Sequence, residues 1–274
     1  MGRSDWKRIA SRGNPMIVQT AKLSSRKFRE ETSTFFFEGV HLLEEYLRFG
    51  WTPKCVFVLE EKEEQFEELL KDLPQDAVIS VPEHVFRKIC TEQAPQGVLT
   101  VSPFLPCVRS VNKASEVPGR LLLLESVRDN GNVGTVIRTA SALGWTCVLS
   151  SDCADIYSPK TVRASMGTVF SGAATVCGDL VSLTEDLKSN GRTVMAAALC
   201  DGGETLGAVP VGPDDCFLVG NEGQGISPEL ISAAGRTVRI PMTGNAESLN
   251  AAVAAAVLMW EGARTDPALV PNNH

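Results

Sequence analysis

Short apolar runs alternate with helical or turn-forming stretches from Leu121 to the end of the chain. Strands that are buried on both faces read as nearly continuous apolar runs, and helices connect such strands in parallel sheets. The alternation therefore predicts an α/β domain with a parallel sheet that is covered by helices. The expected strands are Leu121–Glu125, Cys147–Ser150, Thr175–Cys177, Val194–Leu199, Cys216–Gly220 and Val238–Pro241.

A smaller α/β domain is predicted over residues 33–103. Val40, Leu43 and Leu47 follow the spacing of one helix face, and short apolar runs before and after them are typical of strands. The expected strands are the run from Phe35 to Phe37, Cys55–Leu59, Val78–Val81 and Gly97–Val101, and helices are expected before Gly50, up to Leu70 and over Glu83–Ile89. Several prolines mark a linker over residues 104–119. We therefore divide the chain into a basic N-terminal arm (1–32), the small domain (33–103), the linker (104–119) and the larger domain (120–266).

The net charge of −7 is unevenly distributed along the chain. Residues 1–30 contain eight basic and two acidic residues, a net charge of +6, which leaves −13 for the rest. A basic arm on an acidic body can attract the phosphates of a nucleic acid, although a solvated leader would have the same charge. The charge therefore only supports a nucleic-acid partner that other features indicate.

The composition is that of a packed protein, with 43% hydrophobic and 22% charged residues. The longest apolar stretch, Ala251–Trp260, is shorter than a membrane-spanning helix requires, and the basic N-terminus lacks the apolar core of a secretory signal. We therefore expect a cytoplasmic protein without a membrane partner.

Eight cysteines and three histidines are scattered along the chain. No two cysteines have the C-x-x-C spacing of a zinc or redox site. Several lie in or beside apolar runs, where a reduced cysteine behaves as a small hydrophobic side chain. Free thiols are predicted, and no metal site.

The first candidate site follows the strand that ends at Glu125. The sequence from there reads Glu-Ser-Val-Arg-Asp-Asn-Gly-Asn-Val-Gly-Thr-Val-Ile-Arg, with two glycines that permit close backbone approach and a helix expected to begin near Asn132. Asn132 and Arg138 are six positions apart, about 600° of helical rotation, so they lie on different sides of this helix. Taken alone, the segment also fits an ordinary strand–helix turn with a surface arginine.

Two further strand ends carry unusual residues. Residues 217–227 are rich in glycine around Glu222, whose carboxylate could hydrogen-bond a ligand, but an ordinary turn would look similar. Residues 240–251 lead into a long helix, where Ser248 alone fits a helix cap and Asn250 a solvated first-turn residue. Ligands bind outside the carboxyl ends of strands in open α/β sheets, so these segments are candidate parts of a ligand site.

In order and spacing, the three segments resemble the SpoU (TrmH) family of the SPOUT methyltransferase superfamily. The matching patterns are Arg-Asp-x-Gly-Asn-x-Gly-x-x-x-Arg, Gly-Asn-Glu-Gly-x-Gly and Ile-Pro-Met-x-Gly-x-x-Glu-Ser-Leu-Asn, within residues 121–264. Asn130 stands where the family often has proline. The N-terminal part of the chain, the domain 33–103 that ends with residues 94–101, looks like the ribosomal-protein-L30-like (L30e-like) substrate-binding domain found in many members, which binds RNA.

The resemblance implies a fold that the pattern alone would not predict. It consists of an N-terminal L30e-like α/β domain and a C-terminal SPOUT α/β-knot domain, with a parallel sheet and a deep trefoil knot, a rare exception to the usual rules of topology. Family members are homodimers that pack largely through helices beside the knot. Here the helix 251–260, with Trp260, is the candidate interface.

The resemblance also implies a cofactor, S-adenosylmethionine, and a reaction, methylation of a ribose 2′-hydroxyl in RNA. Ribosomal RNA is the favoured substrate because an L30e-like domain is more typical of the ribosomal RNA enzymes, and tRNA is the alternative. The positions that match the cofactor pocket are Leu218, Gly220, Asn221, Ile240, Met242, Ser248, Leu249 and Ala251.

By the same resemblance, Arg138 is the key residue for catalysis, and Asn132, Glu222, Ser248 and Asn250 orient it and the ribose. A guanidinium stays protonated, so we expect Arg138 to anchor a phosphate and stabilise developing alkoxide charge rather than act as a general base.

Two other functions fit less well. A non-catalytic RNA-binding or ribosome-assembly factor of the same fold would be expected to lack Arg138, Glu222 or Asn250, and all three are present. A nucleotide-dependent metabolic enzyme would need a phosphate-binding glycine fingerprint, which the sequence does not contain.

Overall fold

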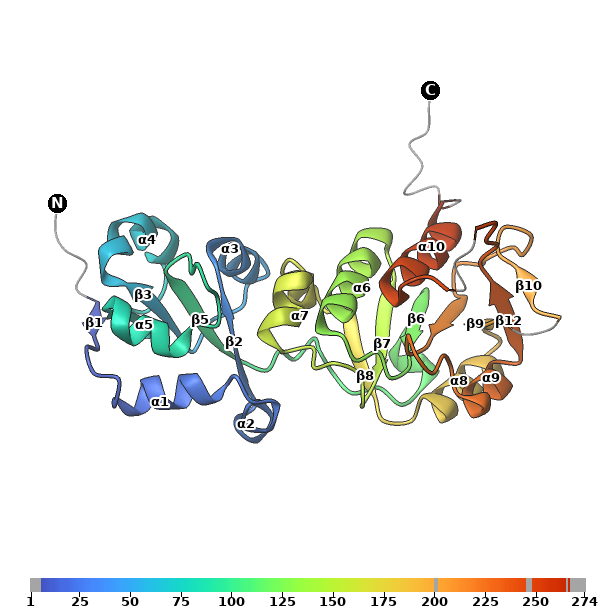
Figure 1. Ribbon diagram of the computed structural model, residues 1–274, viewed down its shortest axis with the longest axis horizontal. Helices are drawn as coiled ribbons and strands as arrows, with labels where there is room; N and C mark the ends of the chain where they lie inside the picture. The colour runs from blue at the N-terminus through green and yellow to red at the C-terminus, as the bar shows by residue number, and fades with distance from the viewer. Residues whose placement is uncertain (1–5, 200–201, 245–247, 265, 267–274) are drawn as a thin grey trace, which may run out of the picture. The chain divides into compact units, whose positions relative to one another are not determined.

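The computed structural model describes residues 6–199, 202–244, 248–264 and 266. The chain forms two compact units (Figure 1). Unit 1 comprises Met1–Pro106 and Asp155–Phe170, and unit 2 comprises Cys107–Ala154 and Ser171–His274. A short segment from the middle of the expected larger domain therefore belongs to unit 1.

Unit 2 contains a seven-stranded sheet in the order β10-β12-β9-β11-β6-β7-β8, in which every pair of neighbours is parallel. The predicted parallel sheet is thus confirmed. Its strands are β6 (Leu121–Leu124), β7 (Thr146–Ser150), β8 (Ala174–Cys177), β9 (Val194–Ala197), β10 (Glu204–Thr205), β11 (Cys216–Val219) and β12 (Arg236–Arg239).

Two pairs of helices cover this sheet. Helices α6 (Asn130–Leu143) and α10 (Ala251–Ala263) pack together, as do α8 (Leu180–Ser189) and α9 (Pro228–Ala234), and Figure 1 shows the two pairs on opposite sides of the strands. Leu121 and Leu218 point into the core on the α8–α9 side, while Phe217 stacks on Trp145 and faces away from that core. The alternation along each strand therefore buries both faces.

Strand β12 differs from its prediction. The expected strand was Val238–Pro241, but the chain pairs over Arg236–Arg239. Only Val238 is buried in this strand, so its arginines concealed it from a search for apolar runs. Pro241 has no backbone N–H to donate to a neighbouring strand, which favours an earlier end.

Unit 1 contains a five-stranded mixed sheet in the order β1-β4-β3-β5-β2. Strand β3 is parallel to β4 and antiparallel to β5, which is also antiparallel to β2. The predicted strands and helices over 33–103 are confirmed. They are β2 (Thr34–Glu38), α3 (Val40–Arg48), β3 (Cys55–Leu59), α4 (Glu63–Leu70), β4 (Val78–Val81), α5 (Glu83–Ile89) and β5 (Val98–Pro103).

The described part of the expected N-terminal arm is built into unit 1. It forms β1 (Lys7–Arg8), which pairs with β4, and the helices α1 (Pro15–Lys22) and α2 (Arg26–Thr32). Ile9, Ile17 and Leu23 are buried in the same core as the strands. Residues 6–32 are therefore part of this unit rather than a separate arm, and only their exposed side chains offer positive charge.

The segment 155–170, with α7 (Pro159–Ala164), completes unit 1. The Tyr157 ring stacks on Phe104 with centroids 4.1 Å apart, and Phe170 packs against Phe37 and Tyr46. Asp155 forms an ion pair with Arg29 at 2.5 Å, and both side chains are largely buried. This segment is held by aromatic packing together with a buried charge pair.

The seven cysteines within the described ranges are free thiols, as predicted. Burial raises the pKa of the Cys216 thiol, and that of Cys55, to about 12. These thiols stay protonated and act as apolar side chains. Cys200 and His274 lie outside the described residues. None of the helices in the described ranges is long and apolar enough to span a bilayer.

Replacing Asp155 with alanine should destabilise unit 1 by about 3 kcal/mol, because it leaves the buried Arg29 guanidinium without its carboxylate. Arg29 would keep only its hydrogen bonds to the carbonyls of Leu23 and Ser24. Urea unfolding measures the change. The control is Glu68→Ala, which removes an exposed ion pair with Lys71 and should change stability by less than about 1 kcal/mol. Equal effects of the two substitutions would contradict the assigned role of the buried pair.

Candidate functional site

A cavity of about 400 Å³ opens at the carboxyl ends of β9, β11 and β12 in unit 2. This is the edge of a parallel sheet at which ligands are expected. Loops from three strand ends and the start of α10 form its wall. The lining residues are Ala197, Ala198, Leu199, Val219, Gly220, Asn221, Glu222, Gln224, Gly225, Ile226, Ile231, Val238, Arg239, Ile240, Met242, Ser248, Leu249, Ala251 and Ala254.

The loop after β11 is folded tightly on itself. Asn221 and Gly225 exchange two backbone hydrogen bonds, at 3.0 and 2.9 Å. A Cβ atom at Gly220 would lie 2.2 Å from the carbonyl oxygen of Gly225, so only glycine fits there. The Asn221 side chain accepts hydrogen bonds from two amides of the loop and donates to the Ser126 carbonyl. Its amide thus holds the loop in place.

The end of β6 supports this loop from behind. Glu125 accepts hydrogen bonds from the Ser227 amide and hydroxyl, at 2.8 and 2.6 Å, which fixes the start of α9. Ser126 has a φ of +54°, and its hydroxyl donates to Asp152. Partial burial raises the pKa of Asp152, but hydrogen bonds from Ser126 and Ser150 outweigh this and leave it below its usual value. No local sequence pattern indicated these supporting contacts.

Three side chains from the three motifs meet at the rim of the cavity. The Asn132 amide donates to the Glu222 carboxylate at 2.5 Å, and its oxygen accepts from the Asn250 amide at 3.1 Å. Asp129 caps α6 and holds the Asn132 backbone, which leaves the Asn132 side chain for these contacts. The sequence-predicted cluster of Asn132, Glu222 and Asn250 is therefore assembled in the structure.

Asn250 rather than Ser248 caps α10, because its side-chain oxygen accepts hydrogen bonds from the amides of Ala252 and Val253. Ser248 lines the cavity but makes no hydrogen bond with any residue that the structure describes. Residues 245–247 of the third motif, including its glutamate, lie outside the described residues.

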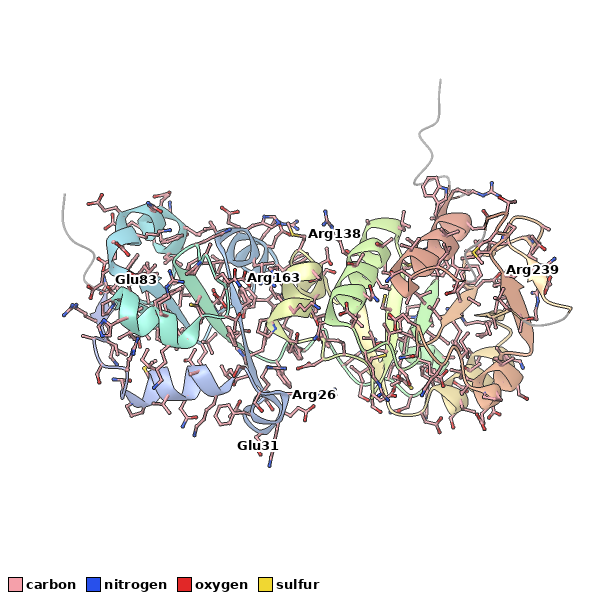
Figure 2. The ribbon with its side chains drawn as sticks, viewed as in Figure 1. Arg26, Glu31, Glu83, Arg138, Arg163 and Arg239 are labelled. Atoms are coloured by element: carbon pink, nitrogen blue, oxygen red, sulfur yellow. The ribbon has the colours of Figure 1, made fainter. Side chains whose placement is uncertain are left out.

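Arg138 stands apart from this cluster. It lies two turns into α6 with an exposed side chain, extends into solvent (Figure 2), and forms neither a hydrogen bond nor an ion pair with the described residues. It does not line the cavity. The helical spacing from Asn132 predicted that the two side chains lie on different sides of the helix, and Arg138 does extend away from the cluster. The expected contacts by which Asn132, Glu222, Ser248 and Asn250 would orient Arg138 are not made among the described residues of one chain. Within one chain, Arg138 is therefore free to contact a substrate.

Most of the predicted cofactor positions lie around the cavity. Gly220, Asn221, Ile240, Met242, Ser248, Leu249 and Ala251 line it. Leu218 does not, because it is fully buried in the core beneath the sheet. Sequence reasoning missed Ala197, Ala198 and Leu199, and also Arg239. Ala197 is the last residue of β9 and the next two follow it, so a search of every strand end of the sheet would have found them.

The cavity combines apolar side chains with backbone groups of a glycine-rich loop, and a carboxylate stands at its rim. This arrangement suits a ligand with a flat apolar part and several polar groups. Among the described residues, no group of three or more His, Cys, Asp or Glu side chains could hold a metal ion.

Comparison with known proteins agrees with the resemblance of the motifs. Residues 119–260 match the model of the SpoU rRNA Methylase family, and residues 14–100 match that of an MRM3-like substrate binding domain. The second match begins at α1, in accord with the inclusion of this helix in unit 1.

Similar proteins cover nearly the whole chain. The 23S rRNA (guanosine(2553)-2′-O)-methyltransferase RlmP of Bacillus subtilis is 32% identical, over 93% of this chain and 98% of its own. The crystal structure of AdoMet-bound rRNA methyltransferase from Sinorhizobium meliloti has 31% identity and a TM-score of 0.79, over 94% of this chain and 97% of that one. The AdoMet complex of the SpoU methyltransferase AviRb from Streptomyces viridochromogenes has 26% identity and a TM-score of 0.78, over 92% and 97%. With its family model matched across the sheet and all three motifs, the chain belongs to the SpoU rRNA methylase family.

Proposed function

We propose that this protein transfers a methyl group from S-adenosylmethionine to a ribose 2′-hydroxyl in ribosomal RNA. Relatives with this reaction in their names align over nearly the full length of the chain. The observation that carries the proposal is the hydrogen-bonded chain of Glu222, Asn132 and Asn250 at the rim of a ligand-sized cavity.

The cavity fits the proposed cofactor in size and chemistry. Its volume of about 400 Å³ lies within the usual range for small-ligand sites. The apolar side chains of Ile240, Met242 and Leu249 can enclose an adenine ring, while the amides and carbonyls around Gly220 can bind polar groups.

The chain's own residues have to position the ribose and remove one proton. The cofactor, when bound, supplies an activated methyl group on a sulfonium. Transfer then requires the ribose oxygen in line with that methyl, and the hydroxyl proton must leave. Glu222 accepts a hydrogen bond from Asn132, and its other oxygen is available to orient the hydroxyl and to accept its proton. Asn250 fixes Asn132, so the polar groups are held before substrate binds.

Arg138 has a separate part in this proposal. A guanidinium is permanently charged and binds phosphate with two parallel hydrogen bonds. Its exposed place on α6, without a protein partner among the described residues, suits a contact with the RNA backbone beside the reacting ribose. This contact would hold the nucleotide and stabilise negative charge on the ribose oxygen.

A homodimer would cover an apolar stripe on α10. Val253, Val257 and Trp260 are exposed by 49%, 36% and 55% and follow the spacing of one helix face. A helix of a monomer would not usually present such a continuous apolar face to water. We propose that a second copy packs on this stripe.

The knot is also part of the proposal. Strand β12 lies beyond β9 in the sheet, yet Asn250, eleven residues after its last residue Arg239, bonds to Asn132 on α6. The start of α10 thus lies beside α6 rather than beside β12. These positions fit a trefoil crossing in this part of the chain.

The direct test is incubation of the purified protein with tritiated S-adenosylmethionine and separate preparations of bacterial ribosomal RNA and tRNA. Label in ribosomal RNA that survives alkali as a dinucleotide would support 2′-O-methylation. Label in tRNA alone would overturn the substrate while keeping the reaction. Absence of both cofactor binding and label would overturn the enzymatic function.

Gly220→Ala should weaken binding of S-adenosylmethionine at least tenfold, about 1.4 kcal/mol, because the new Cβ would displace the Gly225 backbone from the cavity wall. Calorimetric titration measures the affinity. The matched control is Gly223→Ala in the same loop, where a Cβ would meet only the Asn221 side chain at an ordinary 3.5 Å. If both variants bound like the wild type, the cofactor would not occupy this cavity.

Arg138→Ala should lower kcat for methyl transfer by about 100-fold or more, while the affinity for S-adenosylmethionine stays within about twofold. The side chain is exposed and does not line the cavity, so its loss affects only RNA contacts. Single-turnover transfer and cofactor titration give the two values. The control is Arg48→Ala, which removes a different exposed arginine, one that belongs to unit 1. A variant that lost cofactor affinity but kept its turnover would refute this role.

Val257→Lys should convert a dimer into a monomer, since it places a charge in the middle of the proposed interface. Sedimentation velocity reports the mass in solution. Ser189→Lys introduces the same charge on α8, at an exposed position away from α10, and should leave the mass unchanged. A wild-type protein that sediments as a monomer at micromolar concentration would rule out this interface.

A further inference from the structure

Unit 1 contains a second cavity, of about 440 Å³, between its first two helices and the sheet. The start and end of α1, the ring of Phe28 on α2 and the first residues of β2 and β3 form its wall. The lining residues are Pro15, Met16, Gln19, Thr20, Leu23, Phe28, Thr32, Thr34, Lys54, Cys55 and Val101. Its size is that of a small-ligand site, and it lies in a different unit from the cofactor cavity.

Two polar side chains in this cavity lack a protein partner. The Thr20 residue is only 4% exposed, yet its hydroxyl makes no hydrogen bond with any described residue. The Thr20 oxygen is not sealed off from solvent, so a ligand in the cavity can reach it. Gln19, on the same helix, is exposed, and its amide makes no hydrogen bond with the described residues. Donors and acceptors are therefore available to a ligand inside a mainly apolar cavity.

An aromatic ring and a cation stand at the entrance. The Lys22 ammonium lies 5.6 Å from the centre of the Phe28 ring. Phe28 also lines a second, more open hollow on this face, together with Lys22, Lys27 and Lys88. Among the described residues that line this hollow, Glu31 is the only acidic one, and its carboxylate lies 3.8 Å from the Lys27 ammonium. Figure 2 shows Arg26 and Glu31 extending outward from the same helix, α2.

The positive charge at this place contrasts with the whole chain. The exposed Lys54 lines the cavity, and three more lysines line the more open hollow, in a protein of net charge −7. An aromatic ring with flanking lysines is the usual means of binding single-stranded nucleic acid, because bases stack on the ring and phosphates contact the cations. A base inside this cavity could not at the same time be paired in a duplex.

We propose that the cavity of unit 1 takes one unpaired nucleobase of the RNA, stacked on Phe28 and hydrogen-bonded by Thr20 and Gln19. The adjoining phosphates then lie along Lys22, Lys27 and Lys88. This proposal rests on the proposed function, because it assigns part of the RNA contact to a defined pocket. It also locates a determinant of substrate choice far along the chain from Arg138 and Glu222.

The test measures RNA binding by the full-length protein without S-adenosylmethionine, so that it does not depend on methyl transfer. The probe is a fluorescein-labelled 20-nucleotide oligoribonucleotide of randomised sequence, compared with a perfect RNA duplex of the same length. Phe28→Ala should raise the Kd for the single strand about tenfold and change that for the duplex by less than twofold. Thr20→Val, which removes only the hydroxyl, should weaken single-strand binding several-fold.

The matched control is Phe49→Ala. Phe49 also carries a cation over its ring, with the Arg48 guanidinium 4.7 Å from its centre, but it lines neither hollow of this surface. It should bind the single strand like the wild type. Circular dichroism and the affinity for S-adenosylmethionine should be unchanged in all three variants, which separates loss of the pocket from loss of the fold.

Three results would overturn the proposal. In the first, Phe28→Ala loses affinity for the single strand and for the duplex equally. In the second, Phe28→Ala and Phe49→Ala lose the same affinity for the single strand. In the third, the wild-type protein does not bind the single strand more tightly than the duplex. A pocket that instead bound a protein partner would give the last result. Failure of the proposed function shows differently, as absent methyl transfer or cofactor binding by the wild type.

Discussion

The two hydrogen bonds of the Asn132 side chain join segments that lie 90 and 118 positions apart in the chain. They link the first turn of α6 to the loop after β11 and to the cap of α10. Each of these segments is also held by a contact of its own. Asp129 binds the Asn132 backbone, the paired backbone of Asn221 and Gly225 holds the loop, and Asn250 caps the amides of α10. A carboxylate held at the rim in this way does not need to reorganise when a substrate arrives, and such preorganisation is what lowers a barrier.

The loop that carries Glu222 depends in turn on contacts that have no direct part in chemistry. Ser126 adopts a left-handed backbone conformation, which is costly for a residue with a side chain. Bonds to Ser150, the last residue of β7, and to Asp152 in the turn after it offset that cost. The carbonyl of Ser126 then accepts from Asn221, and Glu125 anchors Ser227 beyond the loop. Residues 125 and 126, directly after β6, therefore begin the first motif and also hold the loop of the second.

Much of the fold and of the candidate site could be predicted from the sequence, for physical reasons that also explain the exceptions. Strand β3 and helix α5 were predicted with correct ends, because their apolar residues are continuous or follow one helix face. Strand β12 was displaced since it carries two arginines, and residues 6–32 looked like a free arm because charge hides the three buried residues Ile9, Ile17 and Leu23. The return of 155–170 to unit 1 depends on tertiary contacts such as Arg29–Asp155, which no local pattern records. The motifs predicted that Asn132, Glu222 and Asn250 meet, but Arg138 and Ser248 do not bond to them. Leu218 shows that a strand residue inside a motif can belong to the core.

The separation between Arg138 and the Asn132 cluster has a consequence for how the site works. The cluster is satisfied by protein contacts, whereas Arg138 has none with the described residues, although both lie on one helix. A rigid helix fixes the distance between two groups that diverge by about a third of a turn. If the phosphate contact is made by Arg138, the ribose beside it can meet Glu222 only when the nucleotide adopts a bent path around α6. Substrate selection would then come from the shape of the RNA backbone, and base identity would have to be recognised elsewhere, which is the role that a base pocket in unit 1 would fill.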